Sequence, residues 1–241
     1  MRNNAKNILK KFQFVKFILE LRRRQRSVKS FEKYYLNNPG NYYAENTFDY
    51  FQCIYIHIPK AAGVSVSKAL FGNYGAGHKT IKHWKTKFNV YTFNQYFKFT
   101  IVRNPYTRLY SAYNFLKSGG INNSDKQFST DTLKDYPTFE GFINNYLNNR
   151  TALSQIHFIP QIYFLTDYDN QISVDFIGKF ENLNDSFNFI QSKIGVSSKL
   201  LHINASSYKD YSIESIYTKS MINKVNKIYK DDFLRLEYKM L

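Results

Sequence analysis

The chain has 241 residues, of which 43% are hydrophobic, so it is long enough for one large domain or two small ones. Its formal net charge of +16, from 34 basic and 18 acidic residues, favours an anionic partner such as nucleic acid, an acidic membrane or a phosphorylated or sulfated molecule. Cys53 is the single cysteine, which excludes an intrachain disulfide and a cysteine-rich zinc site.

Most of the positive charge lies near the N-terminus. Residues 1–35 contain eleven Lys or Arg and two Glu, and no known nucleic-acid-binding module is visible, so we expect no nucleic-acid partner. No run reaches the roughly 20 apolar residues of a membrane span. We expect residues 1–40 to form a basic helical extension and residues 41–241 the main domain. The extension is either an amphipathic helix that contacts an anionic membrane through residues 1–35 or a solvated helix. The expected location is cytoplasmic, at most peripheral to the inner face of the membrane.

Strands and helices alternate along the body of the chain. The expected strands are residues 51–58, 98–102 and 174–180. The expected helices are residues 65–71, a helix from Pro105 that Gly119 and Gly120 end, 138–147 capped by Thr138, a helix capped by Asn184 or Asp185 that runs to about 194, and 213–236. Residues 120–137 are polar and are expected to form a long loop. The alternation predicts an α/β domain with a mainly parallel sheet, which binds ligands at the carboxyl ends of its strands.

A loop of small residues joins the first strand to its helix. Its sequence is Pro59-Lys60-Ala61-Ala62-Gly63-Val64-Ser65. The N–H groups and positive dipole end of a helix N-terminus suit a phosphate, and small residues let the anion approach the backbone. Lys60 adds a cation and Ser65 a hydroxyl. Lys60 precedes the glycine, whereas the lysine of a Walker A motif follows it, which argues against a kinase or GTPase.

The second strand leads into another motif at the same edge of the sheet. Its sequence is Val102-Arg103-Asn104-Pro105-Tyr106-Thr107-Arg108-Leu109-Tyr110-Ser111-Ala112-Tyr113. Arg103 follows Lys60 by 43 residues, and Ser111 lies eight residues further along, about two helical turns away. An arginine at a strand end and a serine on the next helix are placed to hold one phosphate together.

Together the two motifs resemble those of the carbohydrate sulfotransferases that use 3′-phosphoadenosine-5′-phosphosulfate (PAPS), a group that includes heparan 2-O- and chondroitin-type enzymes and short bacterial members. The segments that carry the resemblance are residues 56–65, 102–113, 155–161 and 176–181. It implies a P-loop NTPase-like three-layer fold, with helices on both sides of the sheet. It also implies PAPS as donor, no metal, and a hydroxyl of a polysaccharide, lipopolysaccharide or glycolipid as acceptor.

The resemblance also implies roles for individual residues. Lys60 would contact the bridging oxygen of the donor and stabilise the leaving phosphate. The residues that would bind the 5′-phosphosulfate, mostly through backbone N–H groups, are Ala61, Ala62, Gly63, Val64 and Ser65. Arg103 and Ser111 would bind the 3′-phosphate. Ala61 stands where threonine is common, so a hydroxyl contact to the donor would be lost.

The acceptor hydroxyl must lose a proton, and histidine suits the role of base near neutral pH. His78 follows a glycine-rich turn, in the region where larger members of the resembled group carry their active-site histidine, and is the preferred base. His157 and His83 are the alternatives, and His157 also suits acceptor binding. His57 is expected to be structural, and His202 has no expected role.

Two other functions stay open. One is a nucleotide-dependent phosphotransferase of kinase-like chemistry, and the other is a sulfotransferase-fold protein that binds glycans without catalysis, since fold alone does not decide activity. The acceptor is expected to lie against residues 117–137 and 144–157.

Overall fold

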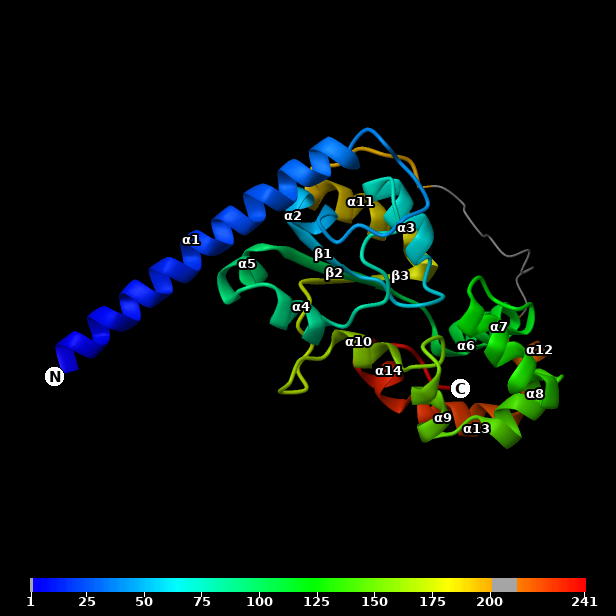
Figure 1. The fold of residues 1–241 in the computed structure, drawn as a ribbon. Coiled ribbons are helices and arrows are strands. Elements are labelled where there is room, and N and C mark those ends of the chain that lie inside the picture. Colours follow the sequence, from blue (N-terminus) through cyan, green and yellow to red (C-terminus); the bar gives the residue numbers. More distant parts are fainter. Residues whose placement is uncertain (1, 201–211) are drawn as a thin grey trace.

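The computed structural model describes residues 2–200 and 212–241, with side chains from residue 11 onward. Three parallel strands form a sheet in the order β1-β2-β3 (Figure 1). Their bounds are β1 Cys53–Ile56, β2 Phe97–Val102 and β3 Phe176–Lys179. Thr100 in the middle strand pairs with Ile56 on one side and Ile177 on the other, so all three strands end at one edge. The predicted α/β fold with a parallel sheet is confirmed.

Helices precede, connect and follow the strands. Their bounds are α1 Arg2–Tyr34, α2 Thr47–Phe51, α3 Gly63–Phe71, α4 Ile81–Lys87, α5 Val90–Gln95, α6 Pro105–Lys117, α7 Asn123–Asp131, α8 Phe139–Gly141, α9 Asn149–Ser154, α10 Gln161–Leu165, α11 Leu183–Ile194, α12 Ile213–Ile216, α13 Lys219–Ile228 and α14 Lys230–Arg235. A π-helix, Phe142–Tyr146, continues α8, and short 3-10 turns cover Leu133–Asp135 and Phe180–Asn182. Figure 1 shows α3 and α11 on one side of the sheet and α4 and α5 on the other.

The apolar side chains form two clusters. The first surrounds the sheet and includes the fully buried Trp84 and Phe99. The second joins α6 to the π-helix and to α13 and α14, through residues such as Leu109, Phe142 and Val225. The second cluster builds a helical part that lies beside the carboxyl edge of the sheet (Figure 1). The carboxyl edge therefore lies between two separately packed parts of the fold.

Helix α1 docks on the sheet part through its C-terminal half, and its N-terminal half projects away from the body (Figure 1). Arg23 donates hydrogen bonds to both carboxylate oxygens of Asp49, at 2.7 and 2.8 Å, and pairs with Glu20. Phe31 is 1% exposed, with its ring 4.8 Å from that of Tyr50. Within the described residues no helix is long and apolar enough to cross a membrane.

Several predicted helix boundaries are confirmed. Asn104 caps α6 by accepting the N–H of Tyr106, with Pro105 as the first helical residue. The same helix ends before Gly119 and Gly120, which adopt φ angles of 93° and 62°. Thr138, the predicted cap of the 138–147 helix, accepts the N–H of Gly141 at 3.0 Å and caps α8.

The prediction of a long loop over residues 120–137 is wrong. Asn122 accepts the N–H of Asp125 at 2.9 Å and starts α7 within this polar stretch. The helix has little apolar periodicity, so a cap and one buried carboxylate take the place of the usual apolar face.

Two further boundaries differ from the prediction. Helix α11 begins at Leu183 after a 3-10 turn, with Asn182 as its N-cap, so neither Asn184 nor Asp185 caps it. The predicted single helix over residues 213–236 is three helices. Thr218 adopts an extended conformation and its hydroxyl accepts the N–H of Met221, which starts a new helix inside the apolar pattern.

Candidate functional site

The loop after β1 turns its backbone toward one side. Lys60 and Ala62 have φ angles of 66° and 61°, in the left-handed region that non-glycine residues rarely adopt. When residues in the left-handed conformation alternate with residues in other conformations, successive backbone N–H groups point into one concavity. Such a concavity suits an anion. Helix α3 starts here with Ala62 as its N-cap, and no side chain caps it. The N–H groups and positive dipole end of a helix N-terminus favour an anion, so this start of α3 suits one.

Gly63 is required for a reason that the sequence did not suggest. A Cβ atom at this position would lie 1.8 Å from the imidazole ring of His57. The glycine therefore makes room for a buried histidine, in addition to any close approach of an anion to the backbone. His57 also stacks on Tyr55, with 5.7 Å between the ring centroids, which fits its predicted structural role.

Lys60 lies over an aromatic ring at the edge of the site. Its Nζ is 3.8 Å from the ring centroid of Phe115, on α6. Burial, together with the positive charge of Arg103, lowers the pKa of Lys60 to about 8. The ammonium group is therefore held in surroundings that disfavour its charge, so it gains from any anion that binds beside it.

The side chain of Arg103 joins the two sequence motifs. Its Nη1 donates to the carbonyl oxygen of Lys60 at 3.4 Å, and its Nε donates to Thr107 at 3.1 Å. The guanidinium carbon lies 4.2 Å from the ring centroid of Phe180, just after β3. Ser111 is on the same helix as Thr107 and is 7% exposed. The structure thus brings the phosphate-type loop and the second motif to one place.

The backbone just after β2 is held by hydrogen bonds to side chains from other segments. The Gln161 side chain accepts the N–H of Arg103 at 2.9 Å and donates to its carbonyl oxygen at 2.8 Å. Glu181 accepts the N–H of Asn104 and the hydroxyl of Tyr238, at 2.8 and 2.9 Å. The segments around residues 161 and 181 therefore fix the strand end from which Arg103 projects.

Two of the predicted candidate bases lie together. The ring centroids of His57 and His78 are 4.2 Å apart, and those of His78 and His157 are 6.3 Å apart. His78 Nδ1 lies 2.8 Å from the carbonyl oxygen of His57. Because a carbonyl only accepts, Nδ1 carries the proton and Nε2 is left unprotonated in the neutral ring. Burial lowers the pKa of His78, which favours this neutral form.

A carboxylate that the sequence did not single out holds His157. Asp125 Oδ1 lies 3.1 Å from His157 Nε2, and both side chains are buried. The guanidinium of Arg108, fully buried, donates to the carbonyl oxygens of His157 and Ile159 at 3.2 and 2.8 Å. Arg108 lies one helical turn before Ser111 in the second motif. This spacing places both residues on the same face of α6, which is the sequence signal for Arg108.

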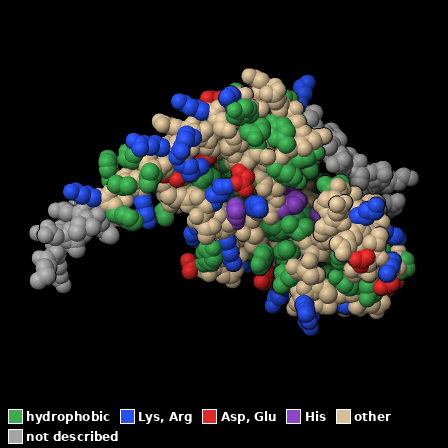
Figure 2. All heavy atoms as spheres, viewed as in Figure 1, with side chains coloured by type: hydrophobic (Ala, Val, Ile, Leu, Met, Phe, Trp, Pro, Cys, Tyr) green, Lys and Arg blue, Asp and Glu red, His purple; other side chains and the backbone are tan. Residues whose placement is uncertain are grey.

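His83 lies elsewhere. It is on α4, where its ring packs edge-on against Trp84 at 5.0 Å, and burial lowers its pKa. His202 lies outside the described residues. Figure 2 shows histidine side chains at the surface where the sheet part meets the helical part. Over the described part of the chain, no three His, Cys, Asp or Glu side chains are grouped to hold a metal ion.

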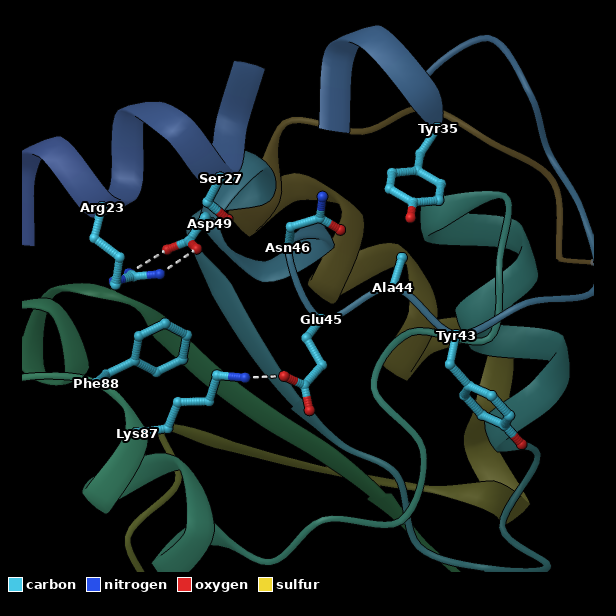
Figure 3. Close-up of a pocket in the computed structure, with 10 residues that line it drawn as sticks. All are labelled: Arg23, Ser27, Tyr35, Tyr43, Ala44, Glu45, Asn46, Asp49, Lys87 and Phe88. Carbon is cyan, nitrogen blue, oxygen red and sulfur yellow. Dashed lines mark hydrogen bonds and ion pairs between the residues drawn. The ribbon is translucent and has the colours of Figure 1, made fainter. Parts of the chain in front are cut away.

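A separate pocket lies where α1 docks on the body (Figure 3). Its lining residues are Arg23, Ser27, Tyr35, Tyr43, Ala44, Glu45, Asn46, Asp49, Lys87 and Phe88. Arg23 pairs with Asp49 and Lys87 pairs with Glu45, so the charged groups in its wall compensate one another. The pocket therefore lacks the excess positive charge of the loop beside Lys60.

Comparison with known proteins identifies the family. No curated protein and no solved structure matches the chain. The model of the sulfotransferase family matches residues 46–239, which include the phosphate-type loop, the second motif and all three strands. The parallel sheet with a loop-helix unit after its first strand agrees with the P-loop NTPase-like fold of such enzymes. The chain therefore belongs to the sulfotransferase family, and is a transferase of sulfo groups.

Proposed function

We propose that the protein transfers a sulfo group from PAPS to a hydroxyl of a carbohydrate. The observation that carries the proposal is the contact between the two motifs, where Arg103 Nη1 reaches the carbonyl oxygen of Lys60 at 3.4 Å. PAPS has anionic groups at both the 5′ and 3′ positions of its ribose. The concave loop with its uncapped α3 suits the 5′-phosphosulfate, and Arg103 with Ser111 suits the 3′-phosphate.

Lys60 would act on the leaving group. In the transfer, the acceptor oxygen forms a bond to sulfur while the bond from sulfur to the bridging phosphate oxygen breaks. Negative charge then grows on that phosphate oxygen, and 3′,5′-adenosine bisphosphate (PAP) departs. An ammonium group in partly buried surroundings stabilises this charge more strongly than one in water, and the lowered pKa of Lys60 reflects such surroundings.

His78 would take the proton of the acceptor hydroxyl on Nε2. Its Nδ1 is committed to the carbonyl of His57, so Nε2 is the nitrogen with a lone pair. The ring is neutral near pH 7 because burial lowers its pKa. The proton that leaves the hydroxyl converts the ring to imidazolium, and it returns to solvent after the products leave.

The proposal is tested by transfer of label from ³⁵S-PAPS to a panel of polysaccharides, lipopolysaccharides and glycolipids. His78→Ala is expected to lower turnover at least ~10²-fold while the Kd for PAP stays within about threefold. His83→Ala, a matched change on α4, is expected to keep turnover within about threefold, because its ring packs against Trp84. Near-normal turnover of His78→Ala would remove His78 as base, and a deficit in His83→Ala instead would reassign the role.

We also propose that the projecting half of α1 contacts an anionic membrane, where a lipid-linked or capsular acceptor is accessible. Phe12, Phe14 and Leu19 are 58%, 65% and 55% exposed, and Lys and Arg residues are interspersed among them. Figure 2 shows hydrophobic and basic side chains beside one another on the projecting helix. Exposed aromatic and basic side chains together suit the interface of an acidic bilayer.

A further inference from the structure

Asp125 places a buried carboxylate in a cluster of basic groups. It is 2% exposed, and His157, with which it pairs, is 7% exposed. The ring of Phe115 lies between the basic groups, with its centroid 4.9 Å from that of His157 and 3.8 Å from Lys60 Nζ. A carboxylate is rarely buried unless it is paired, so the basic groups around Asp125 stabilise its burial.

The start of α7 is built around this carboxylate. A Cβ atom on Gly120 would lie 2.1 Å from the Cβ of Asp125, so only glycine allows the chain to close at this point. Asp125 Oδ2 accepts the N–H of Ile121 at 3.2 Å, and the N–H of Asp125 is held by Asn122 at 2.9 Å. The remaining oxygen, Oδ1, is the one that meets His157.

The pairing fixes the proton on the ring of His157. A carboxylate accepts, so Nε2 carries the proton and Nδ1 has the lone pair in the neutral ring. Nδ1 is buried and has no hydrogen-bond partner among the described residues. An unpaired buried acceptor costs free energy, and a group that donates to it on binding recovers that cost.

We propose that Asp125 is a positioning residue of the transfer reaction: it holds His157 with Nε2 protonated and Nδ1 available, and its negative charge balances the proton that His78 takes. The kinetic part of this proposal rests on the proposed function, whereas the protonation of His157 does not. Before transfer the cluster holds one ammonium and one carboxylate. After proton transfer it holds two cations, Lys60 and His78, and Asp125 keeps their net charge at one.

The charges around the cluster predict how pH acts on a variant. Asp125 favours the charged forms of Lys60, His78 and His157, whereas Lys60 opposes protonation of the two histidines and Arg103 opposes that of Lys60. Loss of the carboxylate therefore lowers the pKa of both His78 and Lys60. The acid limb of activity follows deprotonation of His78 and the alkaline limb follows deprotonation of Lys60, so both limbs move to lower pH together.

The test is Asp125→Asn, which keeps the shape of the side chain. Turnover is expected to fall at least ~10-fold, with the Kd for PAP within about threefold and both limbs of the pH profile displaced to lower pH. Asp131→Asn, on the exposed end of the same helix, is the matched control and is expected to behave as the wild type. Wild-type turnover and unmoved limbs in Asp125→Asn would overturn the proposal.

A second measurement needs neither donor nor acceptor. Long-range ¹H–¹⁵N spectra of the ¹⁵N-histidine-labelled wild type, assigned with His157→Gln, are expected to show His157 neutral at pH 7 with the proton on Nε2. A proton on Nδ1 would overturn the proposal even if Asp125→Asn failed to fold. If the wild type bound no PAP and transferred no sulfo group, the proposed function would fail, and the spectra would still decide the role of Asp125.

Discussion

The role proposed for Lys60 needs a positive charge, and the surroundings of its ammonium group oppose that charge. Burial lowers its pKa to about 8, and Arg103 adds to the effect. The free protein therefore begins to lose the ammonium charge just above neutral pH. An anion bound at the loop raises the pKa again, so ligand affinity and the protonation of Lys60 are coupled.

This coupling predicts the pH dependence of PAP binding. Above pH 8 the free lysine is deprotonated while the bound one is charged, so each further pH unit is expected to raise the Kd up to ~10-fold. Lys60→Arg should abolish this rise, because a guanidinium stays charged over the whole range. Calorimetric titration between pH 6.5 and 9.5 measures both. A wild-type Kd that stays constant to pH 9.5 would contradict the proposed contact.

The residues proposed to hold the donor are easier to predict from the sequence than the residues proposed to arrange the base. The loop from Lys60 to Ser65 and the pair Arg103 and Ser111 lie in two compact motifs, and the structure brings these motifs together. Asp125 lies in a polar stretch without apolar periodicity, and its partner is 32 residues away. A contact between distant polar side chains leaves no local pattern, so it was not predicted.

At the scale of elements, the strands and the helices next to them follow from the sequence. Strands β1 and β2 are largely buried runs with β-branched and aromatic residues, and Pro105 marks the start of α6. The helical part was less predictable. Its C-terminal pattern of apolar residues is continuous, yet the extended backbone at Thr218 breaks the helix because a hydroxyl cap competes with helix propagation.

Helix α14 holds the backbone next to the site through a buried carboxylate. The buried carboxylate of Asp232 accepts the N–H groups of Gln161 and Ile162 at 2.9 and 2.8 Å. Gln161 in turn holds the backbone of Arg103. A C-terminal helix thereby fixes the strand end that carries the second motif.

Replacement of Asp232 tests whether α14 anchors residues 161 and 162. Asp232→Ala leaves two buried N–H groups without an acceptor and is expected to lower the free energy of unfolding by about 1 to 3 kcal/mol for each group. Asp231→Ala, at the exposed neighbouring position, is the control and should change it by less than about 0.5 kcal/mol. Urea denaturation measures both. Equal effects of the two changes would show that α14 does not anchor residues 161 and 162.

At the scale of the whole molecule, α1 departs from a one-sided amphipathic helix. Phe12 and Phe14 are both more than half exposed, yet they lie about 200° apart around the helix axis. Apolar side chains therefore face outward on more than one side of the projecting half. The docked half is held to the body by the Arg23–Asp49 pair, so removal of the whole helix would disturb the domain as well.

A double change in the projecting half tests membrane contact without this disturbance. Phe12→Ser with Phe14→Ser is expected to weaken co-sedimentation with vesicles rich in anionic lipid at least ~10-fold, because each exposed phenyl ring loses its burial in the interface. Leu234→Ser, at an exposed apolar position on the body, should leave it unchanged. Equal binding of the double variant and the wild type, or equal binding to neutral vesicles, would contradict the proposed contact.

The two motifs are proposed to hold a nucleotide with phosphates at both the 5′ and 3′ positions. Calorimetric titration with PAP and with ATP–Mg²⁺ tests this proposal most directly, using the wild type and Arg103→Ala. PAP is expected to bind at least ~10-fold more tightly than ATP–Mg²⁺, and Arg103→Ala is expected to remove most of this preference. Tighter binding of ATP–Mg²⁺, or a preference for PAP that survives the loss of Arg103, would contradict the proposal.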